Sequence, residues 1–167
     1  RNEIIWHKPN CMPSSVKDRF TVDFEKVFFF VKNKKYWFET QYENHSRDWT
    51  NNGGSMYHPE KFPIGSAQHR GGKNPPQMNP LGRNKRSVWS ISTKPFKEAH
   101  FATFPEALIE PMIKAGCPIG GLVLDPFFGA GTTGLVAKKQ SKNYIGIELN
   151  PEYIEIARNR LLQQVLL

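Results

Sequence analysis

Two acidic residues, Asp125 and Glu148, each follow an apolar run, and the stretch after Asp125 contains glycines and threonines spaced to hold a small polar ligand. Asp125 continues as Pro-Phe-Phe-Gly-Ala-Gly-Thr-Thr, ending at Thr133. Gly129 and Gly131 would let a ligand approach backbone N–H groups, and a helix that begins at the threonines would face it with a positive dipole. Glu148 lies close to the separation of about 20 residues at which an acid binds ribose hydroxyls.

The acid before the glycines argues against a nicotinamide dinucleotide. The three glycines at 129, 131 and 134 do read G-x-G-x-x-G, the spacing that holds a pyrophosphate. However, a carboxylate at Asp125 would repel a pyrophosphate and would suit an ammonium group instead. Thr132 and Thr133 could bind a carboxylate or cap the helix. A ligand with an ammonium, a carboxylate and a ribose is S-adenosylmethionine, which we therefore predict as the cofactor.

Hydrophobic periodicity predicts the elements that position these residues. Strands are expected at residues 3–6, 24–31, 36–39, 88–91, 121–125 and 144–148. Helices are expected at residues 106–115, 131–140 and 151–166, with Thr103 as the N-cap of the first and Pro151 as the first residue of the last. Buried positions are expected at Val27 to Phe30 and at Ile154, Ala157, Leu161 and Leu162. Strands that alternate with helices predict an α/β fold with a mostly parallel sheet.

Composition favours a polyanionic partner. The chain has 167 residues, a net charge of +8 and a pI near 9.6. The charge is concentrated in residues 61–100, which hold eight basic side chains and one acidic one; a solvated charged loop is the alternative interpretation. Two cysteines and five scattered histidines give neither a disulfide framework nor a metal-ligand spacing. We predict no metal and no membrane span, and we expect a cytoplasmic protein of bacterial, archaeal or phage origin.

Residues 43–87 are rich in Asn, Gly, Pro and charge and show little periodicity. A segment of this length is too long for an ordinary connection, so it is either a functional insertion or partly disordered. Phosphate contacts within or beside it are predicted at Arg70, Lys73, Arg83, Lys85 and Arg86.

The chain resembles the beta class of DNA amino-methyltransferases, which modify the exocyclic amino group of adenine or cytosine. Residues 125–133 are similar to that family's S-adenosylmethionine loop, and residues 144–153 to its ribose-binding motif. His100-Phe-Ala-Thr-Phe-Pro105 resembles the segment that completes the cofactor pocket. Residues 6–19, with 25–32, resemble the stretch that follows the catalytic loop.

The resemblance implies a Rossmann-like, S-adenosylmethionine-dependent methyltransferase sheet, incomplete at its N-terminus. Residues 1–42 would be core, 43–87 a mostly irregular target-recognition insertion, and 88–167 the cofactor-binding part of the core. Cofactor contacts are expected at His100, Phe104, Asp125, Pro126, Phe127, Phe128, Gly129, Gly131, Thr132, Thr133, Glu148, Leu149 and Asn150. Either phenylalanine of the loop could instead be core. Further DNA contacts are expected at Lys8, Ser14, Ser15, Lys17 and Arg19.

The family's catalytic motif, an Asp, Ser or Asn followed by Pro-Pro and an aromatic, is the main departure. Asn74-Pro-Pro-Gln77 has a glutamine where an aromatic must stack on the base, so we interpret it as a plain loop. We therefore expect the C-terminal portion of a site-specific DNA methyltransferase, with its catalytic residues unknown and no activity without the preceding segment. The alternatives are a cofactor- and DNA-binding remnant or an RNA methyltransferase. Expected partners are double-stranded DNA and, as open alternatives, a second copy or the upstream half of a split enzyme.

Overall fold

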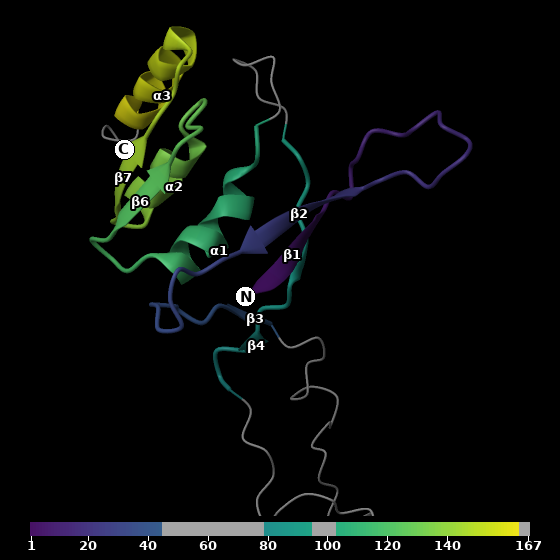
Figure 1. Cartoon of the computed structure of the whole chain (residues 1–167), viewed down its shortest axis with the longest axis horizontal. Coiled ribbons are helices and arrows are strands. Elements are labelled where there is room, and N and C mark those ends of the chain that lie inside the picture. The colour runs from purple at the N-terminus through teal and green to yellow at the C-terminus, as the bar shows by residue number, and fades with distance from the viewer. Residues whose placement is uncertain (45–78, 95–102, 164–167) are drawn as a thin grey trace, which may run out of the picture. The chain divides into compact units, whose positions relative to one another are not determined.

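The computed structural model describes residues 1–44, 79–94 and 103–163 (Figure 1). The chain divides into two compact units, one formed by Arg1–Gln41 with Arg86–Leu167 and the other by Tyr42–Lys85. Over the described residues, no helix is long and apolar enough to cross a membrane. The same residues contain no cluster of three or more His, Cys, Asp or Glu side chains suited to a metal ion.

A three-stranded sheet in the first unit contains β1 (Asn2–His7) between β2 (Phe24–Phe29) and β5 (Val88–Ser90). β1 is antiparallel to β2 and parallel to β5, and the parallel register places Trp6 beside Trp89. Both indoles are buried and pack with Leu108 of α1 (Glu106–Gly116). Each indole N–H donates to a backbone carbonyl, so neither buried donor lacks a partner.

A second sheet pairs β6 (Leu122–Asp125) with β7 (Asn143–Gly146) in parallel (Figure 1). The connection between the two strands contains α2 (Thr132–Lys139), and α3 (Pro151–Gln163) follows β7. The core on the helical side consists of Ile113, Val136 and Ala137, which α1 and α2 contribute. Val123 of β6 and Tyr144 of β7 pack against this cluster, so one face of the parallel pair is covered.

A buried lysine fixes the end of α1. The ammonium of Lys142 donates to the Ile113 carbonyl at 2.8 Å and to Gln140 Oε1 at 3.0 Å. The Ile113 carbonyl also accepts the Cys117 N–H at 3.1 Å, so the lysine adds a second donor to one of the last carbonyls of the helix. Burial lowers the pKa of Lys142 from its ordinary value, because desolvation disfavours the charged form.

Several expectations from the sequence were wrong. Residues 36–39 form no strand. Instead, Tyr36 and Phe38 pack against Phe29 through their rings. Phe28 and Phe30 are exposed rather than core, because successive residues of a strand face opposite sides and only one side of this sheet packs on α1.

Two errors concern helices. The N-cap of α1 is Pro105 and not Thr103, and no side chain caps the helix. In α3, Ala157 and Leu161 are buried, four residues apart on one face, whereas Leu162 is exposed because the next position turns by about 100°. Pro151 is the first residue of α3, as the sequence predicts.

Within the second unit, the structure describes residues 42–44 and 79–85. There β3 (Tyr42–Glu43) pairs antiparallel with β4 (Arg83–Asn84). Arg83 Nε donates to Glu43 Oε1 at 2.9 Å across this pair. Gly82 has φ +102°, and a Cβ there would overlap the Glu43 carbonyl, so a glycine is required where the chain enters β4.

Candidate ligand-binding site

The turn between β6 and α2 needs glycine at two positions for different reasons. Gly129 and Gly131 have φ of +50° and +78°, in the left-handed region that other residues avoid. A Cβ at Gly129 would meet nothing within 4 Å, so this backbone faces open space that a ligand can enter. A Cβ at Gly131 would lie 2.9 Å from Ala157 Cβ, so that glycine allows α3 to pack closely instead.

Glu148 fastens this turn to the end of β7. Its Oε2 accepts the Gly129 N–H at 2.7 Å, and its Oε1 accepts the N–H groups of Leu149 and Asn150, both at 2.9 Å. Hydrogen bonds from Asn150 and then Gly129 lower the pKa of Glu148, because they stabilise its charged form. A carboxylate offers about four lone-pair sites, so capacity for one further donor remains. The sequence predicted Glu148 as a ligand contact, which stays a prediction, and it gave no sign of this anchoring role.

Asp125 organises the start of the turn. Its Oδ1 accepts the Phe127 N–H at 2.9 Å. This hydrogen bond caps the turn, which is the alternative to a contact with the ligand. Its backbone carbonyl also accepts the Ile147 N–H at 2.9 Å, and the Phe128 N–H donates back to the Ile147 carbonyl at 2.9 Å. The turn is therefore tied to the chain after β7 by backbone as well as by Glu148. The contact of Asp125 with a ligand ammonium stays a prediction.

The two phenylalanines of the turn have separate environments. Phe128 is half-buried and stacks on Tyr144, with ring centroids 5.8 Å apart. A Cβ at Gly134 would lie 2.6 Å from its ring, so this ring fills the space above the glycines of α2 and β7. Phe127 is 87% exposed and is therefore the one available to a ligand. Leu149, beyond Glu148, is also highly exposed.

The threonines at the start of α2 are buried but do not cap it. The N-cap residue is Gly131, with no side-chain hydrogen bond to the first turn, which leaves N–H groups there for a ligand. Arg160 of α3 donates to the Ala130 carbonyl at 2.5 Å and to Thr132 Oγ1 at 3.3 Å. Because Oγ1 accepts this bond, the Thr132 hydroxyl proton can point to a ligand acceptor. Arg160 was missed from the sequence; its position three residues after Ala157 is the signal that places it on the packed face.

A polar cavity of about 460 Å³ lies beside the start of α2. It is lined by Lys94, Thr103, Phe104, Pro105, Glu106, Ala107, Glu110, Thr132, Lys139 and Arg160. Two predicted cofactor residues, Phe104 and Thr132, are thus brought together there, whereas Asp125, Gly129 and Glu148 do not line it. Lys139 Nζ lies 2.6 Å from Glu106 Oε2, so part of the cavity's charge is already paired.

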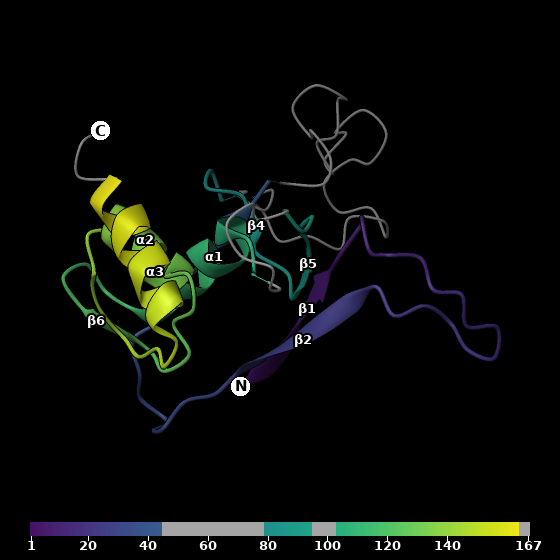
Figure 2. The same cartoon turned by 90° about the horizontal axis from the view of Figure 1, so that it is seen from above.

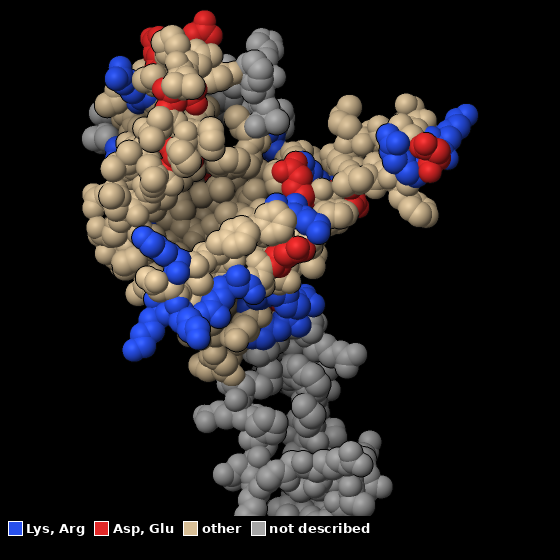
Figure 3. Space-filling view, in the orientation of Figure 1, with Lys and Arg blue, Asp and Glu red and all other residues tan. Residues whose placement is uncertain are grey.

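The predicted DNA contacts are scattered over the described parts of the chain. Lys8 pairs with Glu25, and its ammonium lies 4.6 Å from the Trp6 ring centroid, so its charge is engaged. Arg83 pairs with Glu43. Lys17 and Arg19 are exposed and belong to the segment between β1 and β2. This segment projects from the sheet, and Figure 3 shows basic and acidic side chains together at its outer end. His100, Arg70 and Lys73 lie outside the described residues.

Comparison with known proteins assigns a family. The DNA methylase family of the N6/N4 class matches residues 1–159. The chain is 43% identical over 161 residues to the type II methyltransferase M.Cfr9I of Citrobacter freundii, covering 96% of this chain and 44% of that protein. It is 40% identical to M.SmaI of Serratia marcescens, covering 98% of this chain and 47% of that protein. The chain thus spans about half the length of these curated relatives.

Solved structures agree on the fold. The crystal structure of the M1.HpyAVI–SAM complex matches with a TM-score of 0.61 at 27% identity, covering 96% of this chain and 61% of that one. The PvuII DNA methyltransferase, described as cytosine-N4-specific, matches with a TM-score of 0.64 at 22% identity, covering 95% of this chain and 49% of that one, and this shows a shared fold only. The described sheets and helices are therefore part of a Rossmann-like methyltransferase fold.

Proposed function

This chain belongs to the N6/N4 DNA methylase family, and on that basis we propose that it is the S-adenosylmethionine-binding part of a site-specific DNA methyltransferase. The observation that carries the proposal is the Glu148 carboxylate, which holds the open Gly129 backbone and keeps capacity for one more donor. The M1.HpyAVI–SAM complex, which has a similar structure, supports S-adenosylmethionine as the ligand.

Each part of the ligand has a fitting group in the described structure. The Glu148 carboxylate would accept a hydrogen bond from a ribose hydroxyl. The exposed Phe127 and Leu149 would cover the apolar faces of the adenine. The Thr132 hydroxyl, oriented by Arg160, and the first N–H groups of α2 would bind the amino-acid carboxylate. The second carboxylate oxygen of Asp125 would accept a hydrogen bond from the ammonium group of the cofactor. The sulfonium of the bound cofactor supplies an electrophilic methyl group.

The acceptor that we propose is the exocyclic amino nitrogen of adenine or cytosine in DNA. Its lone pair is delocalised into the ring, so the enzyme must hold the amino group in line with the methyl group; positioning is a large part of the catalysis. The base must also leave the duplex to reach the site, at a cost of a few kcal/mol for unstacking. The role of this chain is to fix the methyl donor for that geometry.

Binding of the cofactor and of DNA without methyl transfer is the second candidate function for this chain. Its 167 residues include no Asp, Ser or Asn followed by Pro-Pro and an aromatic, and the curated relatives are about twice as long. The catalytic residues of the transfer are therefore not assigned to positions in this chain.

Two assays test the proposal. Calorimetry with S-adenosylmethionine should give saturable binding that Glu148→Ala weakens, while the retention of DNA by the chain is unchanged; equal loss of both would make Glu148 purely structural. Radiolabelled methyl transfer should be measured with the chain alone and with the chain joined to the N-terminal half of the Citrobacter relative. Labelling of RNA but not of DNA by the joined protein would refute the substrate assignment.

A further inference from the structure

An ion pair connects α1 with α2 at the polar cavity beside the start of α2 (Figure 2). Lys139 Nζ lies 2.6 Å from Glu106 Oε2, and both residues line the cavity. Lys139 follows Thr132 by seven residues, which is close to two helical turns, so both side chains lie on the same face of α2. The ion pair and the buried Thr132 therefore border the same space.

Other contacts hold α1 against α2 and the chain that follows it. Gln140 Nε2 donates to the Glu110 carbonyl at 3.0 Å. Lys142 Nζ donates to the Ile113 carbonyl at 2.8 Å, and the Ile113 side chain is part of the core that α1 and α2 share. Both side chains of the ion pair are partly exposed, and exposed pairs contribute little to folding stability. Loss of the Lys139 charge should therefore leave α1 in place, so the role of this lysine is electrostatic.

The charge inside the cavity depends on whether Glu106 is neutralised. Under the proposed function, the cofactor carboxylate binds at Thr132, which Arg160 orients, and both of these residues line the cavity. Like charges repel more strongly near a protein than in bulk water, because the effective dielectric constant is lower. An unpaired Glu106 carboxylate would therefore oppose a second carboxylate in this cavity. Lys139 supplies the opposite charge in a short, charge-assisted hydrogen bond.

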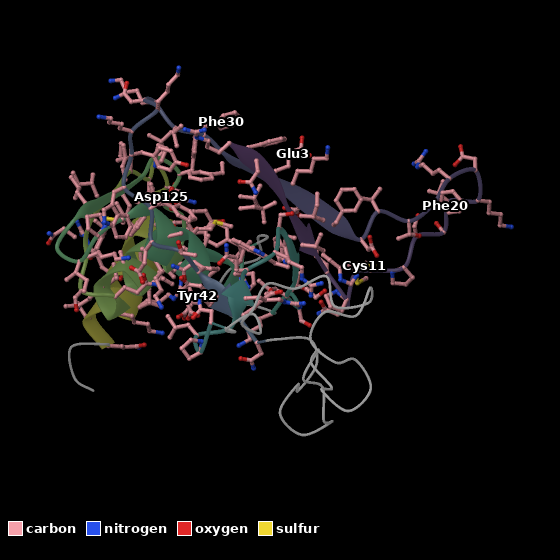
Figure 4. The ribbon with its side chains drawn as sticks, turned by 90° about the horizontal axis from the view of Figure 1, so that it is seen from below. Glu3, Cys11, Phe20, Phe30, Tyr42 and Asp125 are labelled. Atoms are coloured by element: carbon pink, nitrogen blue, oxygen red, sulfur yellow. The ribbon has the colours of Figure 1, made fainter. Side chains whose placement is uncertain are left out.

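We propose that Lys139, by pairing with Glu106, makes the site specific for a cofactor that carries a carboxylate. Lys139 is a positioning residue, because it acts on the ligand through the Glu106 carboxylate. The inference rests on the proposed function, in which S-adenosylmethionine is the ligand. Asp125, to which that proposal assigns the ammonium, ends β6 (Figure 4) and does not line the cavity. The carboxylate is therefore the charged group of the ligand that Glu106 would meet.

The test is isothermal titration of the intact chain with S-adenosylmethionine and with decarboxylated S-adenosylmethionine, which keeps the sulfonium and the amine. Lys139→Met should weaken S-adenosylmethionine binding about fivefold, because the Glu106 charge is left unpaired beside the carboxylate. The same variant should bind the decarboxylated compound as tightly as wild type or more tightly. Lys138→Met is the matched control. Lys138 Nζ donates to the Leu161 carbonyl at 3.0 Å and does not line the cavity, so both affinities should stay within about twofold.

Removal of the acid separates charge from packing. Glu106→Gln alone should keep or raise the affinity for S-adenosylmethionine. Glu106→Gln combined with Lys139→Met should restore that affinity to within about twofold of wild type, because neither charge remains. The loss in Lys139→Met should also shrink in about 1 M salt, where exposed charges more than about 3 Å apart are screened. A purely structural ion pair predicts instead that both single variants lose affinity and that the double variant does not recover.

Four results would overturn the inference: an equal effect of Lys139→Met on both compounds, no effect included; a gain of S-adenosylmethionine affinity in that variant; a double variant as weak as Lys139→Met; or a Lys139→Met chain that circular dichroism shows to be unfolded. Any of these with saturable S-adenosylmethionine binding by wild type would leave the proposed cofactor function standing. A folded wild-type chain that binds neither compound would refute the proposed function itself, and the inference with it.

Discussion

Gly146→Ala should destabilise the protein, because the added methyl group would overlap sterically with the carbon atoms of the Phe128 ring. A Cβ at Gly146 would lie 2.6 Å from Phe128 Cδ1 and still closer to Cγ and Cδ2. Carbon atoms make favourable contact near about 3.5 Å, so the ring would have to shift by roughly 1 Å. The ring cannot move freely, since it stacks on Tyr144 and lies over Gly134. Overpacking of this kind costs about 1–3 kcal/mol of unfolding free energy.

The same structure predicts strong coupling between the two positions. In a Phe128→Ala background the space is empty, so Gly146→Ala should become neutral or slightly stabilising. The coupling energy from urea denaturation should therefore be about 1–3 kcal/mol. Gly116→Ala is the control, because a Cβ there meets nothing within 4 Å and alanine favours the helix. Additive effects within about 0.5 kcal/mol, or a harmless Gly146→Ala, would refute the packing described for Phe128.

Three further predictions concern the ligand. Phe127→Ala should lower S-adenosylmethionine affinity in calorimetry but change the unfolding free energy by less than about 0.5 kcal/mol, because the ring is exposed; a large loss of stability would contradict its assignment. Arg160→Met should lower affinity for S-adenosylmethionine about tenfold while 5′-methylthioadenosine, which lacks the carboxylate, is bound as before; equal losses would show a purely structural role. The lowered pKa of Glu148 means that its contribution is present above the unfolded pKa near 4.5 and is lost as pH falls through the folded pKa. Acid titrations followed by circular dichroism should therefore show a transition that Glu148→Gln removes, and an unchanged curve would exclude the anchoring role.

The sequence predicted those features of the site that depend on residues close together in the chain, such as the turn after β6 and the starts of α2 and α3. Gly129 and Gly131, the threonines and Pro151 mark the turn and the starts of α2 and α3, because glycine permits the left-handed backbone that the turn needs and proline fixes φ at a value that suits the first turn of a helix. Strand and helix order in this region followed from hydrophobic periodicity.

Features that depend on contacts between distant segments could not be predicted. The different roles of Phe127 and Phe128 depend on which ring meets Tyr144 and the glycines of other elements. The anchoring by Glu148 and the hydrogen bonds of Arg160 depend on how the turn, β7 and α3 meet. The sequence also gave no indication that Phe28 would be exposed, because an aromatic run looks alike whether one face or both faces of its sheet are covered.

The central claim is that the turn after β6 and the Glu148 carboxylate form a binding site for S-adenosylmethionine. Isothermal titration of the folded chain with S-adenosylmethionine tests it most directly, with S-adenosylhomocysteine as competitor and Glu148→Ala as the matched variant. The structure predicts one saturable site, displaced by the competitor and weakened in the variant. A folded chain that binds neither compound, or that binds both equally well without the Glu148 carboxylate, would contradict the claim.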